Sequence, residues 1–202
     1  MTFSNLADSA GYALGINIAS SLKLQDITSI NRELIYTAME AVFKGDSLLI
    51  HPDAAYGVMN TFVQRQAREK ALAIIKAGED FLAENAKRPE VKTTASGLQY
   101  EVITEGTGEK PTANDIFVCH YRGSLIDGTE FDASYNRNQP LEYGVSQVIK
   151  GWTEGLQLMP VGSKYKFYIP YQLGYGVNGS PPVIPGGSAL IFEVELLEVK
   201  KR

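Results

Sequence analysis

Hydrophobic residues in about the first ninety positions recur every three or four residues, which is the spacing of amphipathic helices. The pattern predicts one helix over about 4–24 and a second over about 30–44, with Gly45 placed to end it. A third helical pattern over 52–88 ends before Pro89. A helix of that length would extend roughly 55 Å. We interpret it as a long arm; the alternative is a broken helix that folds back on its neighbours.

The helical region offers little material for a core of its own. Two short helices and the start of a third supply fewer than about sixty residues, a size at which a single core is marginal. Gly11 and Gly15 stand four positions apart, so a second helix could approach that face closely. We therefore predict a homodimer formed through residues 1–60.

Beyond a polar hinge at 90–96, the helical spacing gives way to alternation of apolar and polar residues, which is typical of strands. Strands are predicted over 98–104, 116–126, 164–169 and 189–199. Asp127-Gly128 is a hairpin signal, and one short helix over about 147–159 is left to cover the apolar face. The predicted fold class is α+β, with a helical domain over 1–92 and an antiparallel sheet curled round one helix over 93–202.

Composition excludes several classes of function. The net charge is −4 and the basic residues are scattered, which argues against nucleic acid as a partner. Cys119 is the only cysteine, and its apolar surroundings indicate a buried residue rather than a nucleophile. His51 and His120 are the only histidines, and we interpret His120 as a packed strand residue. We expect neither a metal site nor a cofactor.

The amino-terminal region has no Lys or Arg before Lys23, and polar residues such as Asp8 and Asn17 interrupt its apolar positions. That pattern matches neither a secretory signal peptide nor a membrane span. We expect a cytoplasmic protein from the sequence as written, or a periplasmic or surface protein if a signal peptide was removed.

The stretch 148–156 contains the only tryptophan, Trp152. A Gly/Pro-rich loop over 175–185 follows, and it begins with Tyr175. An indole on a short helix, faced by a tyrosine and by branched aliphatic residues, predicts an apolar pocket with one polar handle. The GxGxxG pattern over 174–179 does not indicate a nucleotide site, because the prolines after it cannot open a helix.

Five motifs in this order resemble the FKBP family of peptidyl-prolyl cis-trans isomerases, which are the receptors of the macrolides tacrolimus and rapamycin. They are VxHYxG at 118–123, GxxFDxS at 128–134, VIxGWxEGLxxMxVG at 148–162, YGxxGxPPxIP at 175–185 and LxFxVELL at 190–197. With the helical region included, the chain resembles the two-domain bacterial macrophage infectivity potentiator proteins. The resemblance implies the FKBP half-barrel, a homodimer, macrolide binding, and isomerisation of X-Pro bonds in proline-containing unfolded or partly folded polypeptides.

The resemblance also implies roles for individual residues. Trp152 would form the floor under the prolyl ring, Tyr175 would donate its hydroxyl to a substrate carbonyl, and Asp132 would orient the amide, held by Tyr121 or Arg137. The implied catalytic residues are Asp132, Tyr175, Trp152 and Phe192, and the implied substrate-binding residues are Tyr121, Phe131, Arg137, Leu141, Val148, Ile149, Val183 and Ile184. The structural alternatives are plain core packing for Phe192 and Val148 and turn capping for Asp132.

Two positions depart from the commonest family pattern. Leu141 stands where many members have an aromatic residue, and Ser180 stands where some have a histidine. Both bear on macrolide affinity and on the preference for the residue before proline. The competing functions are a holdase chaperone, in which the helical region binds unfolded chains, and a non-catalytic adaptor, which would need a spoiled pocket.

Overall fold

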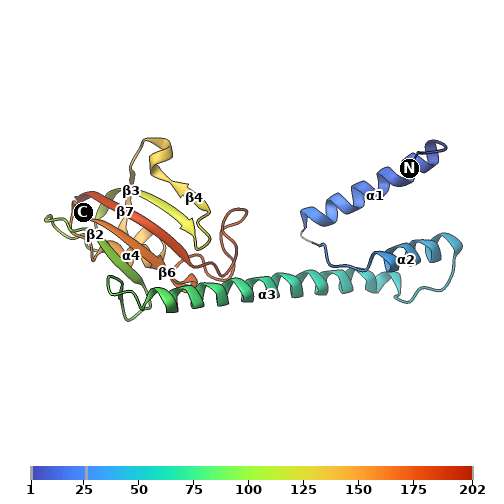
Figure 1. Ribbon diagram of the computed structural model, residues 1–202, viewed down its shortest axis with the longest axis horizontal. Helices are drawn as coiled ribbons and strands as arrows, with labels where there is room; N and C mark the ends of the chain where they lie inside the picture. Colours follow the sequence, from blue (N-terminus) through green and yellow to red (C-terminus); the bar gives the residue numbers. More distant parts are fainter. Residues whose placement is uncertain (1, 26, 202) are drawn as a thin grey trace. The chain divides into compact units, whose positions relative to one another are not determined.

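A computed structural model describes residues 2–25 and 27–201 (Figure 1). The chain forms two compact units, Met1–Gln66 and Ala67–Arg202. The division falls inside helix α3 (Pro52–Asn85), because the later turns of α3 pack with the second unit. The domain boundary predicted at residue 92 stays a prediction.

The first unit contains α1 (Leu6–Leu24), α2 (Arg32–Lys44) and the first turns of α3. Side chains cap the starts of the two short helices: the Asp8 N–H donates to Asn5 Oδ1 at 2.9 Å, and Asn31 caps α2 in the same way. Gly45 ends α2 in the left-handed conformation at φ 70°, as predicted. None of the nineteen residues of α1, all of them described, is buried.

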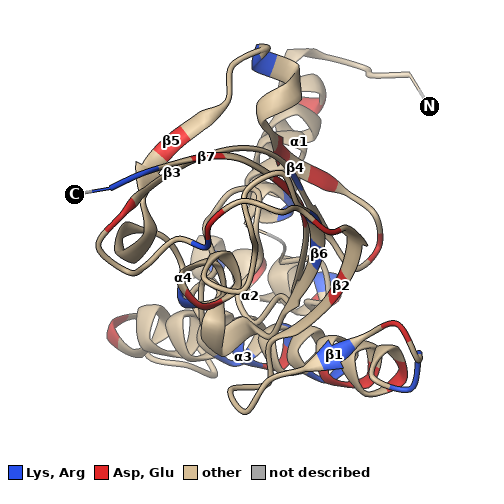
Figure 2. Ribbon diagram, turned by 90° about the vertical axis from the view of Figure 1, so that its left-hand side faces the viewer, with Lys and Arg blue, Asp and Glu red and all other residues tan. Residues whose placement is uncertain are grey.

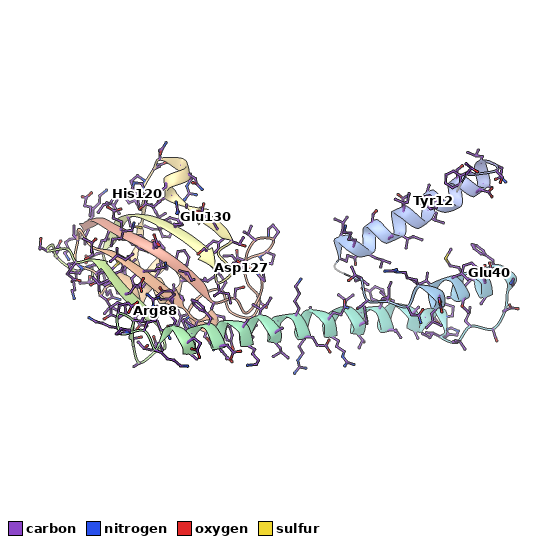
Figure 3. All side chains as sticks on the ribbon, in the orientation of Figure 1. Tyr12, Glu40, Arg88, His120, Asp127 and Glu130 are labelled. Carbon is purple, nitrogen blue, oxygen red and sulfur yellow. The ribbon has the colours of Figure 1, made fainter. Side chains whose placement is uncertain are left out.

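Helix α3 is continuous over 34 residues, so the broken-helix alternative is wrong. It ends at Asn85, short of the predicted end at residue 88. After Asn85 the backbone bonds change to i→i−3, from the Lys87 N–H to Glu84 O and from the Arg88 N–H to Asn85 O, both at 3.1 Å. At the same place the buried Asn85 side chain donates to Gln99 Oε1 at 2.9 Å, and Arg88 donates to Glu101 at 2.5 Å. These contacts attach the end of α3 to the sheet, and Figure 3 labels Arg88 at that end.

The second unit is built on a seven-stranded antiparallel sheet in the order β1-β2-β6-β7-β3-β4, with β5 also paired to β3. The strands are β1 (Lys92–Thr93), β2 (Gln99–Thr104), β3 (Ile116–Leu125), β4 (Glu130–Ala133), β5 (Leu141–Gly144), β6 (Lys164–Ile169) and β7 (Leu190–Lys200). Three short 3-10 helices complete it: η1 (Ser134–Arg137), η2 (Val145–Gln147) and η3 (Tyr171–Leu173).

Helix α4 (Lys150–Leu156) packs against one face of the curved sheet (Figure 1). It is shorter than the predicted helix over 147–159 at both ends. Gln147 lies in η2, Val148 is extended and Ile149 is the N-cap residue, and the helix ends at Leu156. Its glycines allow the close approach: a Cβ at Gly151 would come within 2.6 Å of Ile169 Cγ2. The core beneath α4 includes Cys119, which is fully buried as predicted.

Charged residues are interspersed along the strands of the second unit, as the red and blue segments of Figure 2 show. Several form ion pairs, such as Lys166 with Glu193 at 3.3 Å and Arg122 with Glu130 at 3.0 Å. Among the helices of the described residues, none combines the length and the apolar character needed to cross a bilayer.

Candidate active site

A cavity of about 670 Å³ opens between α4, the strands β3, β4 and β7, and the loop after η3. A cavity of this size suits a small apolar ligand group. It is lined by Tyr121, Phe131, Asp132, Leu141, Gln147, Val148, Ile149, Trp152, Tyr175, Ser180, Pro181, Val183, Ile184 and Phe192. The structure therefore brings together every predicted site residue except Arg137, which contacts the cavity residue Asp132 instead. Their functional roles stay predictions.

Aromatic rings form the deepest part of the cavity. Trp152 is 4% exposed, and its ring meets those of Tyr121 at 5.3 Å and Phe192 at 5.2 Å, both nearly perpendicular. Phe131 meets Phe192 edge-on at 5.4 Å. Perpendicular contacts place the positive edge of one ring against the negative face of another. Trp152 Nε1, the one buried side-chain N or O without a hydrogen-bond partner among the described residues, lies within this aromatic cluster.

One carboxylate stands at the rim of the cavity. Asp132 Oδ2 accepts a short hydrogen bond from the Tyr121 hydroxyl, and Asp132 Oδ1 accepts from Arg137 Nη1 at 2.6 Å. The other Arg137 nitrogen, Nη2, donates to the Tyr121 hydroxyl at 2.9 Å. The sequence left open whether Tyr121 or Arg137 holds Asp132, and in the structure both do. Asp132 belongs to β4 rather than to a turn cap.

The surroundings set the charge state of these groups. Burial acts to raise the pKa of Asp132, but the hydrogen bonds from Tyr121 and Arg137 outweigh it, and the pKa lies below its ordinary value. Burial and the Asp132 hydrogen bond raise the pKa of Tyr121 to about 12. Burial, with the nearby Asp132 charge, also raises the pKa of Tyr175. At neutral pH the site thus holds one carboxylate, one guanidinium and two protonated phenols.

The Gly/Pro-rich loop supplies the remaining wall. Its start is fixed by the Gly176 N–H, which donates to Tyr171 O at 2.8 Å, and its tip closes through an isolated bridge between Ser180 and Ile184. The Tyr175 and Val183 side chains are 40% and 50% exposed, so both can reach a bound molecule.

Three lining residues were not predicted as site residues: Gln147, Ser180 and Pro181. Ser180 and Pro181 lie inside the loop motif, so the loop itself was a signal for them. Gln147 lies in η2, and its side chain folds back over Gly144. Its place in the cavity depends on the extended backbone that follows it, which no local pattern indicated.

Comparison with known families agrees with the site. The family described as FKBP-type peptidyl-prolyl cis-trans isomerase matches residues 107–197, and the family described as the domain amino terminal to FKBP-type peptidyl-prolyl isomerase matches residues 7–102. Together they cover both predicted regions of the chain.

Individual relatives are similar along most of their length. An FKBP-type peptidyl-prolyl cis-trans isomerase FkpA of Aeromonas hydrophila is 44% identical over 93% of this chain and 68% of its own. The FKBP-type 22 kDa peptidyl-prolyl cis-trans isomerase of Escherichia coli is 37% identical over 98% of both chains. A protein of Legionella longbeachae named outer membrane protein MIP is 34% identical over 96% of this chain and 86% of its own.

A solved structure extends the similarity to the fold. The crystal structure of FkpA from Escherichia coli superposes with a TM-score of 0.80 and 35% identity, covering 99% of both chains. The predicted fold class and the predicted family are both confirmed. The chain belongs to the family of FKBP-type peptidyl-prolyl cis-trans isomerases.

Proposed function

We propose that the chain accelerates rotation about X-Pro peptide bonds in folding polypeptides by binding the twisted amide non-covalently in the cavity between α4 and the Gly/Pro-rich loop. The observation that carries the proposal is the combination of an aromatic floor, built on Trp152, with one rim carboxylate, Asp132, held by a tyrosine and an arginine. An apolar ring fits the floor, and an amide fits the polar rim.

The energy that such a site must supply is modest. Rotation about a peptide bond has a barrier of about 18–20 kcal/mol, and uncatalysed X-Pro isomerisation takes tens to hundreds of seconds. A thousandfold acceleration requires only about 4 kcal/mol, since each 1.36 kcal/mol is tenfold. Neither a nucleophile nor a metal ion is needed for a change of this size.

The cavity can supply that energy in two ways. A planar amide has more charge separation than a twisted one, so an apolar environment that excludes water destabilises the planar ground state relative to the transition state. The shape of the floor can also favour the twisted conformer. The aromatic contacts of Trp152 support both effects, because they keep the floor apolar and fixed.

Two polar groups would orient the substrate. The raised pKa of Tyr175 keeps its phenol protonated, so its hydroxyl can donate to a substrate carbonyl. The lowered pKa of Asp132 keeps the rim carboxylate charged, with Arg137 balancing that charge. Asp132 would then act on the amide electrostatically rather than by proton transfer.

A protease-free isomerisation assay on a series of proline tetrapeptides tests the proposal. Asp132→Val should lower kcat/KM by about tenfold or more. The matched control is Asp80→Val, which removes a carboxylate from the exposed face of α3 and should leave kcat/KM unchanged. A wild-type chain no faster than buffer would reduce the cavity to a binding site and refute the enzymatic proposal.

We further propose a homodimer through residues 1–60. In the first unit a groove of about 450 Å³ runs between α1 and α2, and apolar side chains on α1 remain exposed, among them Leu14 at 51% and Ile16 at 52%. A Cβ at Gly11 or Gly15 would meet nothing within 4 Å. This open face would accept a helix of a second copy. Sedimentation equilibrium should give twice the chain mass of 22.1 kDa.

A chaperone role is the second candidate function. Its support is a set of exposed apolar residues beyond the α1–α2 groove, including Phe43 at 79%, Leu49 at 94% and Tyr56 at 82%. If it is correct, Asp132→Val should still suppress aggregation of an unfolded client while its isomerisation activity falls. Loss of both activities together would assign them to the cavity alone.

Macrolide binding is a proposal that the same assay tests. Rapamycin should compete with the tetrapeptide if Leu141 and Ser180 still allow a macrolide to enter. The cytoplasmic location stays a prediction.

A further inference from the structure

A single short segment, 132–137, binds both the phenol hydroxyl and the backbone of Tyr121. Asp132 and Arg137 bind its phenol at the cavity rim. Ser134, which lies between them at the start of η1, binds its backbone: the Tyr121 N–H donates to Ser134 Oγ at 2.8 Å, and Ser134 Oγ donates to Tyr121 O at 3.2 Å. Ser134 is fully buried. The position of the Tyr121 ring in the cavity therefore depends on both sets of contacts.

The Ser134 hydroxyl takes the place of a missing strand partner. The β3–β4 ladder runs to the pair Arg122 and Ala133, so Ser134 is the residue that would pair next with Tyr121. The chain instead turns into η1 at Ser134. On that side the Tyr121 N–H and C=O would have no ladder partner, and buried backbone groups without partners are costly. A single hydroxyl oxygen satisfies both groups.

His120 is the third neighbour of that hydroxyl, with Nδ1 at 2.9 Å from Ser134 Oγ. A hydroxyl has one proton to donate and can accept two hydrogen bonds. If Nδ1 carries no proton, it competes with Tyr121 O for the hydroxyl proton, and one of the two acceptors is left without it. If Nδ1 carries a proton, His120 and the Tyr121 N–H both donate to Oγ, and the hydroxyl proton goes to Tyr121 O. Only this second arrangement gives a partner to each group that meets at Ser134 Oγ, namely His120 Nδ1, the Tyr121 N–H and Tyr121 O.

The His120 ring is held in the orientation that this arrangement needs. It stacks on Tyr135 at 4.8 Å with 18° between the ring planes, and the Tyr135 hydroxyl donates to Glu195 at 3.2 Å. Glu195 on β7 is also the strand partner of His120. Figure 3 labels His120 near the β4–η1 segment. The imidazole is thus held by Ser134 and Tyr135 of η1, and Tyr135 is in turn bonded to β7.

We propose that Ser134 and the Nδ1–H tautomer of His120 are positioning groups, which hold the Tyr121 backbone so that its hydroxyl meets Asp132 at the cavity rim. The effect on isomerisation rests on the proposed function; the effect on structure does not.

The tautomer is tested directly by long-range ¹H–¹⁵N NMR of the histidine rings at neutral pH. The chain has two histidines, and His51→Gln identifies the His120 signals. The expected result is a protonated Nδ1 in the wild type and loss of that preference in Ser134→Ala. A protonated Nε2 with a bare Nδ1 in the wild type would overturn the proposal.

Kinetics of Ser134→Ala test the positioning role. The expected result is a fall in kcat of about tenfold with KM changed by less than about twofold, because the floor still binds the prolyl ring while the rim groups lose their alignment. Ser134→Thr keeps the hydroxyl and should recover most of kcat. Emission of Trp152, the only tryptophan, is an independent readout, because its ring lies 5.3 Å from that of Tyr121. Unchanged kcat and unchanged emission in a folded Ser134→Ala protein would overturn the proposal.

If the Ser134 variants do not fold, a matched pair at His120 decides. His120→Asn can present an N–H near the position of Nδ1, whereas His120→Asp presents only an acceptor that takes the hydroxyl proton from Tyr121 O. Both variants also carry Glu195→Gln, which removes the carboxylate of the residue paired with His120 on β7. Asn should retain the wild-type Trp152 emission and kcat to within about threefold, and Asp should shift the emission and lower kcat by about tenfold. Equal behaviour of the pair would refute the tautomer.

If the wild-type chain has no isomerase activity, the proposed function is refuted, but the proposed positioning of Tyr121 is not. The NMR tautomer and the Trp152 emission would still test how Tyr121 is positioned.

Discussion

Replacing Gly151 with alanine should lower the isomerase activity of the chain more than its stability. The added Cβ would lie 2.6 Å from Ile169 Cγ2 and 3.0 Å from Ile169 Cδ1, whereas carbon atoms in contact are ordinarily about 3.5–4.0 Å apart. We expect helix α4 to relieve this overlap by moving away from β6 by about 1 Å. Trp152 is the next residue, so its indole moves with the helix, away from Tyr121 and Phe192.

The two consequences differ in size. Overpacking costs about 1–3 kcal/mol, and the gain in helix propensity from Gly to Ala offsets about 1 kcal/mol of it. The net loss of unfolding free energy should be at most about 2 kcal/mol. A displacement of about 1 Å in a positioned group can cost about a hundredfold in rate. We expect kcat/KM to fall by between about tenfold and a hundredfold.

The assay pairs tetrapeptide isomerisation with urea unfolding. The matched control is Gly57→Ala in α3, where a Cβ meets nothing within 4 Å. It should stabilise the chain by up to about 1 kcal/mol without changing kcat/KM. A Gly151→Ala protein with full activity would show that the floor tolerates the shift, and the rate would then not depend on the exact position of Trp152.

Three further predictions concern other parts of the chain. Hydrogen bonds from the Thr112 backbone and side chain lower the pKa of Asp115 to about 2, so its stabilising effect is complete above its unfolded pKa and is lost as pH falls through about 2. In Asp115→Asn the unfolding free energy should lose that part of its pH dependence. An unchanged slope of unfolding free energy against pH would contradict this expectation. Gly15→Ala should weaken the proposed dimer in sedimentation by about tenfold, and an unaltered dimer would move the interface elsewhere. Arg137→Gln removes a hydrogen bond and a positive charge that lower the pKa of Asp132, so the acid limb of the pH profile of kcat/KM should move to higher pH. An acid limb that stays in place would show that the ionisation of Asp132 does not control the rate.

Local pattern predicted the long elements of this fold well. The third helix and the strands β2, β3, β6 and β7 lie within a few residues of their predicted positions, because each repeats its spacing over six residues or more. The short strands β1, β4 and β5 were missed, since four residues or fewer are too few to establish an alternation. Strand β1 lies in the segment predicted as a hinge and forms because β2 offers it an edge, and β4 and β5 form on the edges of β3; all three are long-range effects.

The start of α4 shows a different limit. Val148 and Ile149 continue the apolar spacing of Trp152 and Leu156, so the sequence predicts them as helical. In the structure neither is helical: Val148 is extended, Ile149 is the N-cap residue of α4, and both line the cavity. The residues of the site followed from motifs, but the pairing of Arg137 with Asp132 and the hydroxyl of Ser134 behind Tyr121 depend on contacts across strands. Helical spacing carries no information about such contacts.

Strand β3 links the geometry of the site to the geometry of the sheet. Its side chains alternate, so Tyr121 points into the cavity while its neighbours His120 and Arg122 point toward the charged groups outside. Gly123 then leaves space over the strand: a Cβ there would lie 2.6 Å from Phe131 and 2.7 Å from Phe192. Any larger residue would push these two rings apart and open the cavity wall. The same strand therefore carries a central pairing of the sheet, the rim tyrosine and the room for the aromatic wall, so a larger residue at Gly123 would disturb the site and the packing of the sheet together.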